Sequence, residues 1–361
     1  AFAKTGFTFA KKPYQSIGVI YQAKYQETQA RFGTRQFDGT ETRGYVNAIY
    51  DGIIKTTNHK IRTGLSFVYS DITQKLDSMK IMREEIIPGA FAEYTYIGLR
   101  FTYIAGVRAD LHNLYGVQVT PRLHGKYALN ENLDFRFSGG KGFRVSNVMI
   151  DNISLLANSR EWVIDSILDP EVSWNFGGSL VQSFKIKNRK ASISVDFYHT
   201  FFENQVIVDR DRSTDHIYFS NLKGTSYSNS FQAELSLPIL KTFDIRLAFK
   251  YLDVKSKFGD NIQQQVMIPR YRGLINLSYK TRNKRWEYDL TGSLIGKKRL
   301  HAISDDFGNV STDNESQVFP LLNAQVTHVI RAWEFYLGGE NILNYTQKDP
   351  IVDVDKPFGS N

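Results

Sequence analysis

Apolar and polar residues alternate with a period of two along much of the chain. Between Leu99 and Asp110, one face carries apolar side chains: Leu99, Phe101, Tyr103, Ala105 and Val107. The opposite face carries mainly polar ones: Arg100, Thr102, Arg108 and Asp110. The alternation recurs in Lys190–Thr200, Thr242–Tyr251 and Trp286–Thr291. One apolar face and one charged face in each segment predict antiparallel β-strands with one wet side.

Short and long connections between the predicted strands alternate along the chain. Tight turns are expected at Lys55–His59, Tyr96–Gly98, Asn130–Asp134, Lys187–Lys190, Pro238–Thr242 and Thr281–Arg285. Longer connections are expected at Arg31–Thr40, Thr73–Ile87, Asp110–Gly116, Ser146–Glu171, Asp209–His216, Ser256–Gln265 and His301–Gln317. This segregation is typical of a transmembrane β-barrel, with short periplasmic turns and long extracellular loops. The spacing predicts about fifteen full strands and a strand tail at the N-terminus.

The composition narrows how such a chain could cross a membrane. The mean hydropathy is −0.34, and no stretch approaches the ~18 apolar residues of a spanning helix. A membrane protein of this composition would therefore be a barrel, in which only alternate residues face lipid. The absence of cysteine excludes disulfides and thiolate metal sites. The net charge of +8 is spread along the chain among acidic residues, which argues against nucleic-acid binding.

Both ends of the sequence look like parts of something larger. Residues Ala1–Ala10 lack the charged start and apolar core of a signal peptide and read as the tail of a strand. The chain stops at Asn361 after a predicted loop, where another strand ought to begin. An open edge in lipid would leave backbone groups unsatisfied. We therefore expect residues 1–361 to form one partial β-barrel domain, with further strands outside this sequence.

Four short segments point to a family. They are Pro88–Tyr94 (PGAFAEY) with Ala105–Asp110 (AGVRAD), Thr120–Leu123 (TPRL) with Ser138–Arg144 (SGGKGFR) and Asn147–Asn152 (NVMIDN), Leu168–Asn175 (LDPEVSWN), and Gly338–Pro350 (GGENILNYTQKDP). In this order they resemble the second half of a TonB-dependent receptor barrel of the kind common in Bacteroidetes. The resemblance covers nearly the whole chain.

The resemblance carries expectations about fold and function. It implies a barrel of about 22 strands occluded by a plug, in the outer membrane of a Gram-negative bacterium. It implies a receptor, not an enzyme, that imports a ferric siderophore, a metal chelate or a vitamin without a bound cofactor. The implied partners are the TonB system acting through the plug, outer-membrane lipid and lipopolysaccharide, the small-molecule ligand and a surface lipoprotein. The plug, the TonB-contacting segment and the remaining strands are expected outside this sequence. The alternatives are a passive porin and a soluble all-β carbohydrate-binding protein.

Candidate ligand-binding residues lie in one loop and on the predicted lumen face. The loop Ser146–Glu171 carries Arg160 and Trp162 beside Asn158 and Ser159, a mixture suited to hydrogen bonding and stacking on a chelated ligand. The alternative is a loop folded over the barrel mouth for its own stability. Further cationic candidates are Arg144 near the loop base and Arg100, Arg108 and Arg136 on the lumen face, with Arg246 and Lys250 adding to a basic interior. That interior would attract anionic chelates, or pair with acidic groups of the plug.

The remaining motifs favour structural interpretations over catalytic or metal-binding ones. Gly139–Lys141 lacks the rest of a phosphate-binding loop and is better read as a bend in a strand. Asp209, Asp211, Ser213 and Asp215 alternate like calcium ligands, but the glycine and glutamate of a calcium loop are missing, so a solvated loop is the simpler interpretation. The seven histidines show no metal-ligand spacing, and Asp306–Gly308 spells a kinase triplet without its companions. No catalytic and no metal site is predicted.

Overall fold

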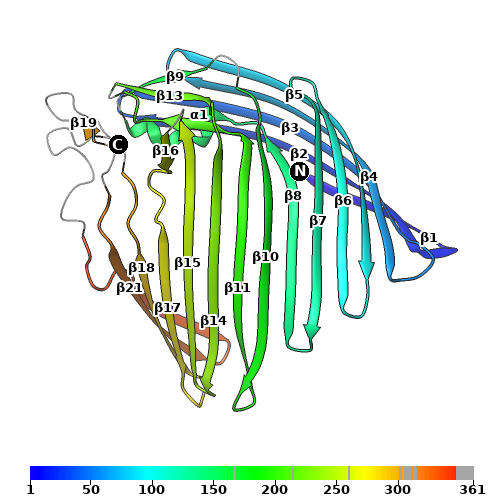
Figure 1. Ribbon diagram of the computed structural model, residues 1–361, viewed down its shortest axis with the longest axis vertical. Helices are drawn as coiled ribbons and strands as arrows, with labels where there is room; N and C mark the ends of the chain where they lie inside the picture. Colours follow the sequence, from blue (N-terminus) through cyan, green and yellow to red (C-terminus); the bar gives the residue numbers. More distant parts are fainter. Residues whose placement is uncertain are drawn as a thin grey trace.

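The computed structural model describes residues 1–158, 160–165, 168–213, 215–258, 261–300, 303–304, 310–311 and 315–346. Most of them form one antiparallel sheet of seventeen strands (Figure 1). The strands are β1 (Phe2–Phe9), β2 (Lys12–Phe32), β3 (Arg35–Ile53), β4 (His59–Leu76), β5 (Met79–Ile97), β6 (Phe101–His112), β7 (Gly116–Asn130), β8 (Leu133–Arg144), β10 (Glu171–Ile186), β11 (Arg189–Asn204), β14 (Ser226–Leu240), β15 (Phe243–Phe258), β16 (Asn261–Gln264), β17 (Tyr271–Lys280), β18 (Trp286–Ile295), β21 (Phe319–Ile330) and β22 (Trp333–Gly339).

Each strand of this sheet pairs with its neighbours in chain order. The strands β16 and β17 pair with successive parts of β15, so the seventeen strands occupy sixteen positions. The prediction of about fifteen strands and a strand tail is therefore confirmed. Among the described residues, β1 pairs only with β2 and β22 only with β21. The total of 22 strands stays a prediction.

The remaining elements gather at one end of the sheet. They are α1 (Val148–Asp151), η1 (Ile153–Ala157), β9 (Glu161–Ile164), β12 (Val206–Asp209), β13 (His216–Asn221), β19 (Ile303–Ser304) and β20 (Val310–Ser311). We call the group α1, η1, β9, β12 and β13 the cap, and its side of the molecule the cap end (Figure 1). The opposite, turn end carries tight turns such as Lys187–Asn188 and Lys241–Thr242. In the described part of the chain, no helix is long and apolar enough to cross a membrane.

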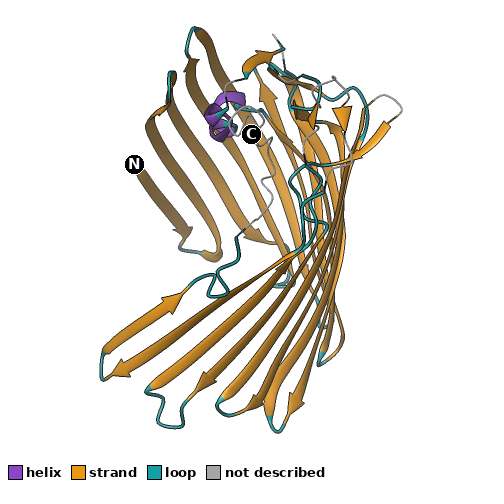
Figure 2. Cartoon of the chain, turned by 90° about the vertical axis from the view of Figure 1, so that its left-hand side faces the viewer, coloured by secondary structure: helices purple, strands orange, loops and turns teal. Residues whose placement is uncertain are grey.

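The two faces of the sheet differ in chemistry, and contacts with the cap identify the concave one (Figure 2). The backbone N–H of Ile150 in α1 donates to the side chain of Gln74 on β4 at 3.1 Å. Gln74 therefore points into the concavity, and the opposite side chains of β4, Leu65 and Phe67, are exposed on the convex face. Apolar residues on the convex face of other strands, such as Leu180, are likewise exposed. An apolar outer face of this extent suits hydrocarbon rather than water.

Aromatic rings form a band on the convex face near the turn end. Tyr96 and Tyr103 on β5 and β6 lie 5.6 Å apart, and Phe101 lies 5.4 Å from Tyr103 and 6.4 Å from Phe137. Gly125 leaves the space that Phe137 fills, because a Cβ there would lie 2.2 Å from the ring. Aromatic side chains are enriched at the two membrane–water interfaces. The band therefore matches the level at which a bilayer would end.

Two expected long loops are instead parts of strands. Arg31–Thr40 and Thr73–Ile87 form hairpins closed by the tight turns Gly33–Thr34 and Asp77–Ser78, and their ladders run unbroken through these segments. The strand β2 has 21 residues, about twice the ~9–11 that span a bilayer. The hairpins project beyond the membrane level because their concave side packs against the cap. The expected strict alternation of connection length is therefore wrong for this half of the chain.

The assignment of faces can be tested on two neighbouring residues of β7. Leu123 is convex and His124 concave, and both are exposed near the middle of the strand. Leu123→Arg should destabilise the folded receptor by ~2–4 kcal/mol, because it places a charge in hydrocarbon. His124→Arg, the matched control, should change stability little. Equilibrium urea unfolding of the receptor in lipid vesicles measures both, and equal effects of the two variants would contradict the assignment.

Candidate ligand-binding site at the mouth of the sheet

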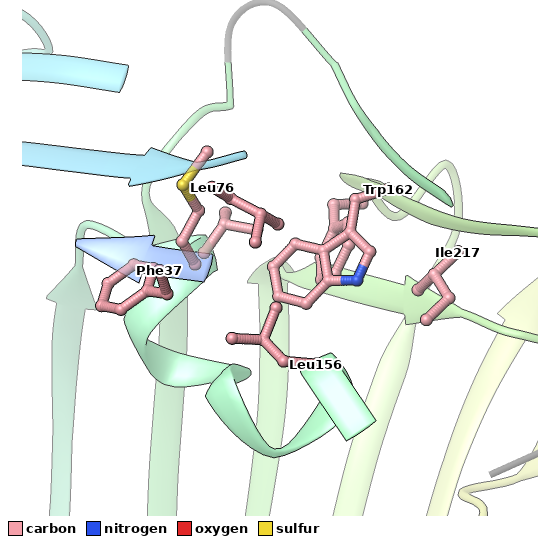
Figure 3. Close-up of a cluster of buried hydrophobic side chains, with 8 residues drawn as sticks. Phe37, Leu76, Leu156, Trp162 and Ile217 are labelled. Atoms are coloured by element: carbon pink, nitrogen blue, oxygen red, sulfur yellow. The ribbon is translucent and has the colours of Figure 1, made fainter. Parts of the chain in front are cut away.

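The cap has a hydrophobic core of its own. Trp162 of β9 is 5% exposed, and its ring lies 4.8 Å from that of Phe219 on β13. The same cluster contains Leu156 of η1 and Ile217 of β13, with Phe37 and Leu76 from the hairpins (Figure 3). Burial of a large apolar side chain contributes ~1.5–3 kcal/mol. The cap is therefore a packed unit that is joined to the projecting hairpins.

Arginine side chains fasten this unit to the hairpins. Arg35 on β3 donates from Nη1 to the carbonyl oxygen of Arg160 at 2.7 Å, and its Nε lies 3.2 Å from a carboxylate oxygen of Asp77. Arg83 on β5 donates to the carbonyl oxygen of Ser146 at 3.0 Å and to the side chain of Asn147. These bonds satisfy carbonyl groups of the loop that would otherwise be buried without donors. They hold the cap across the concave face.

Two predicted ligand-binding residues are part of the cap interior. Arg160 is 4% exposed and donates from Nη1 to the carbonyl oxygen of Arg210 at 2.9 Å. Burial lowers the pKa of the Arg160 guanidinium. Trp162 belongs to the hydrophobic core, and Asn158 is buried beside them, while Ser159 lies outside the described residues. This placement fits a loop folded for its own stability, and a ligand contact by Arg160 or Trp162 stays a prediction.

Arg144 lies at the base of the cap. It ends β8, and its guanidinium pairs with Glu171, the first residue of β10, at 2.6 Å and with Asp151 of α1 at 3.4 Å. The pair joins the two strands between which the cap loop leaves and returns. The Arg144 side chain is still 61% exposed, so it can reach solvent at the mouth. Its role in ligand binding stays a prediction.

A cavity of about 370 Å³ lies on the concave face below the cap. Its lining includes Asn47, Arg62, Phe91, Arg108, Thr120 and Arg122. We call it the wall cavity. Arg62, Arg108 and Arg122 come from β4, β6 and β7, and the strand register turns all three toward the same face. The wall cavity is thus lined by a row of guanidinium groups with polar neighbours.

Each of these guanidinium groups has a carboxylate partner on the same wall. Arg108 pairs with Asp110 at 2.6 Å, Arg122 with Glu93 at 2.5 Å and Arg62 with Asp51 at 2.7 Å. On β15, Arg246 pairs with Glu234 in the same way. The lumen face was expected to be basic, but these arginine side chains are paired with carboxylates. Only the Arg62–Asp51 pair is exposed on both sides, and such pairs contribute ~0–1 kcal/mol, whereas Glu93 and Asp110 are 12% and 5% exposed.

The other two predicted lumen arginines lie elsewhere. Arg136 on β8 is exposed on the concave face, opposite Lys126 on one side and Ser179 on the other, nearer the turn end. Arg100 lies in the turn between β5 and β6, where its carbonyl oxygen accepts a hydrogen bond from Ala128. The side chain of Arg100 is exposed at the turn end, and its place in the lumen stays a prediction. Neither residue lines the wall cavity.

Arg62 and Arg122 were not singled out from the sequence. Arg122 stands inside the segment Thr120–Leu123 that carried part of the family resemblance. Arg62 alternates with Ile61 and Thr63 at the start of β4, and the same period of two that placed Arg108 would have placed it. Period-two alternation predicts that both side chains face the lumen. It does not predict that they lie close together, because that depends on the register between strands.

The motifs that resemble a calcium loop and a phosphate-binding loop have structural explanations. Asp209 accepts hydrogen bonds from the backbone N–H groups of Asp211 and Arg212, and Asp211 pairs with Arg299 at 2.6 Å, so these carboxylates do not converge on a cation. Within the described ranges, no group of three or more histidine or acidic side chains could hold a metal. Gly139 lies inside β8, where a Cβ would approach Phe176 to 2.9 Å. Thr214, His301 and Asp306–Gly308 lie outside the described residues.

Residues 4–342 match the family described as TonB dependent receptor-like, beta-barrel. The chain belongs to this family. Its members are transporters of the Gram-negative outer membrane and not enzymes. The predicted family, fold class and localisation are confirmed, and the soluble alternative is wrong. A comparison with curated proteins gives no match.

Solved receptors share the fold. The receptor FpvA from P. aeruginosa, in complex with a heterologous ferric pyoverdine, superposes with a TM-score of 0.71 at 12% identity, over 95% of this chain and 52% of that one. An enterobactin complex of the ferric enterobactin receptor PfeA from Pseudomonas aeruginosa gives 0.68 at 12%, over 92% and 55%. The iron transporter FrpB from Neisseria meningitidis gives 0.63 at 12%, over 95% and 67%. The chain spans about half the length of FpvA and PfeA.

The cap core predicts a local effect of mutation. Trp162→Ala should destabilise the cap by ~3–5 kcal/mol, since it leaves a large cavity among buried side chains. The loops 146–171 and 205–225 should then exchange amide hydrogens faster, while the strands at the turn end keep their protection. Val163→Ala, at the next and more exposed position of β9, serves as the control. Unchanged exchange in the Trp162 variant would show that the cap is not held by this core.

Proposed function

We propose that the chain is the barrel wall of a TonB-dependent receptor that imports a scarce ligand, a ferric siderophore or another metal chelate, or a vitamin. The observation that carries this proposal is the wall cavity, in which guanidinium groups from three strands face the interior of a sheet whose other face is apolar. The cap end would be extracellular and the turn end periplasmic.

The ligand class follows from the chemistry of the wall. Arginine presents paired donors that match carboxylate, hydroxamate and catecholate oxygens. The guanidinium groups of Arg62, Arg122 and Arg108 are 52%, 57% and 33% exposed, so each can offer N–H groups to an anionic chelate while it keeps its carboxylate partner. The fold-related proteins FpvA and PfeA were solved with a ferric pyoverdine and with enterobactin. Both lines of support favour a ferric chelate over a vitamin.

The rest of the proposed cycle involves parts beyond the described wall. Residues 1–361 would form a single barrel domain around a plug, and the TonB system would move that plug to open the lumen. Ligand would reach the wall cavity past Arg144 at the mouth, and Arg136 would lie further along the path. Lipopolysaccharide would surround the outer rim, and a surface lipoprotein is a further candidate partner at the cap end.

A passive porin is the competing function. A porin keeps a water-filled channel through its lumen. Here, the cap is packed across the concave face and bonded to the hairpins, which suits a receptor whose passage opens only on demand. Family membership points the same way.

Uptake by cells tests the proposed function. Cells with and without the gene are given radiolabelled iron on a panel of ferric siderophores and as ferric citrate. At least one chelate should accumulate only when the gene is present, and a protonophore or deletion of the TonB gene should abolish that accumulation. Uptake that continues without an energised inner membrane would support the porin instead. A second panel of labelled vitamins covers the remaining ligand class.

The wall cavity generates a site-specific prediction. Arg122→Gln should raise the KM of uptake about tenfold or more, because a hydrogen bond to a charged group contributes ~1.5–3 kcal/mol. The maximal rate should change little, because Arg122 is 57% exposed and its replacement leaves the packing of the wall intact. Arg282→Gln, in an exposed turn at the turn end, is the matched control. An unchanged KM in the Arg122 variant would show that the ligand does not bind in the wall cavity.

A further inference from the structure

The hairpin turns at the two ends of the sheet differ in charge. At the turn end, eight short connections close the hairpins, from Ala10–Lys11 to Arg331–Ala332 (Figure 1). We call them the rim. The rim contains nine lysine and arginine residues and a single acidic residue, Glu131. No lysine or arginine stands in the tight turns of the cap end, which are Gly33–Thr34, Asp77–Ser78 and Asn113–Tyr115.

The positive charge of the rim is not neutralised within the sheet. All nine lysine and arginine residues are exposed. Carboxylates near the strand ends already have basic partners on the strands: Asp134 pairs with Lys126 at 2.9 Å, Asp244 with Arg189 at 3.1 Å and Glu287 with Lys280 at 2.7 Å. Among the described residues, no salt bridge reaches a lysine or arginine of the rim. The charge is therefore available to a partner outside the chain.

The backbone at four rim positions indicates that the charged side chains have a use. Lys55, Lys187, Lys284 and Arg331 have φ between 46° and 62°. Glycine and asparagine adopt this left-handed region with less strain than other residues. A tight turn needs only its backbone geometry, which either of them would supply. Long cationic side chains at strained positions therefore favour a function for the charge over a purely structural role.

The rim lies next to a second group of aromatic side chains. The ring of Tyr288 lies 6.4 Å from that of Trp286 and 6.2 Å from that of Tyr279. The register, followed strand by strand from Leu180, places these rings on the convex face. Arg285 of the rim directly precedes Trp286. Aromatic rings mark the membrane–water interface, and long basic side chains beside them extend to the headgroups. The charge of the rim therefore lies at headgroup level.

We propose that the rim binds the phosphate groups of anionic phospholipids in the leaflet on the turn-end side. Lysine and arginine form charge-assisted hydrogen bonds with phosphate oxygens. An anionic headgroup is preferred over a zwitterionic one, because the latter carries a positive group that offsets its phosphate. Such binding would hold the sheet at a fixed depth in the membrane. That this leaflet is periplasmic rests on the proposed function, whereas the lipid contact rests on the charge and level of the rim.

Quenching of tryptophan fluorescence by brominated lipids tests this proposal, since Trp286 and Trp333 stand beside the rim. The full-length receptor is reconstituted in vesicles of phosphatidylcholine and phosphatidylglycerol, with one lipid or the other brominated. Phosphatidylglycerol should bind about fivefold or more tightly than phosphatidylcholine, and ~1 M salt should bring this ratio toward one. Lys284→Gln combined with Arg285→Gln should lower the ratio at least about twofold. A ratio of one in the native receptor, or the native ratio in this variant, would overturn the proposal.

The matched control removes two charges from the other end of the molecule. Lys75→Gln with Lys80→Gln changes an exposed cross-strand pair on the convex face of the projecting hairpin, above the membrane level, and should keep the native ratio. Equal loss in this control would contradict a site at the rim. Lys284→Arg with Arg285→Lys keeps both charges and should also keep the ratio, and heat-modifiable gel mobility shows that each variant is folded.

Two further outcomes separate this inference from its alternatives. Isolated peptidoglycan that binds the native receptor but not the Lys284→Gln, Arg285→Gln variant, together with a lipid ratio of one, would assign the rim to an acidic polymer instead. Energy-dependent uptake without a lipid preference would overturn the lipid site alone. A lipid preference in a receptor without energy-dependent uptake would support the rim and contradict the proposed function.

Discussion

A hydrocarbon layer offers no hydrogen-bond partners, so every backbone N–H and C=O group inside it must find one within the protein. The sheet meets this requirement by pairing each strand with its neighbours along the chain. Period-two alternation then follows, since one face of every strand meets lipid and the other meets water. Ion pairs such as Arg122–Glu93 lie on the concave side for the same reason. The arrangement of charge in the wall cavity is thus a consequence of satisfying the backbone.

Above the level of the membrane, the same ladders serve a different purpose. The strands β2 to β5 continue far past the length that a bilayer requires, and their concave side chains Phe37 and Leu76 join the core of the cap. The cap could not bury its own apolar residues alone, because its helices are single turns and its strands are short. The hairpins supply the missing surface. The mouth of the receptor is therefore shaped by strand extension as much as by loops.

Local pattern was enough to predict the strand number, the opposite chemistry of the two faces and the family, because each depends on neighbouring residues. It was insufficient where contacts are distant in sequence. Polar residues around Gly33 and Asp77 resembled loops, although they are exposed positions of strands above the membrane. The segment with Arg160 and Trp162 resembled a polar ligand-binding loop, but both side chains are buried, and Trp162 shares a core with Phe37 and Ile217 from distant parts of the chain.

The parallel pairing of β9 with β13 joins connections that belong to different hairpins. Their backbones share a ladder, so neither segment can lengthen, shorten or shift by one residue without breaking bonds in the other. Related receptors that carry this joint should therefore change both segments together when they acquire a new cargo. Grafting one of the two loops alone onto another barrel would transfer half of an interlocked structure.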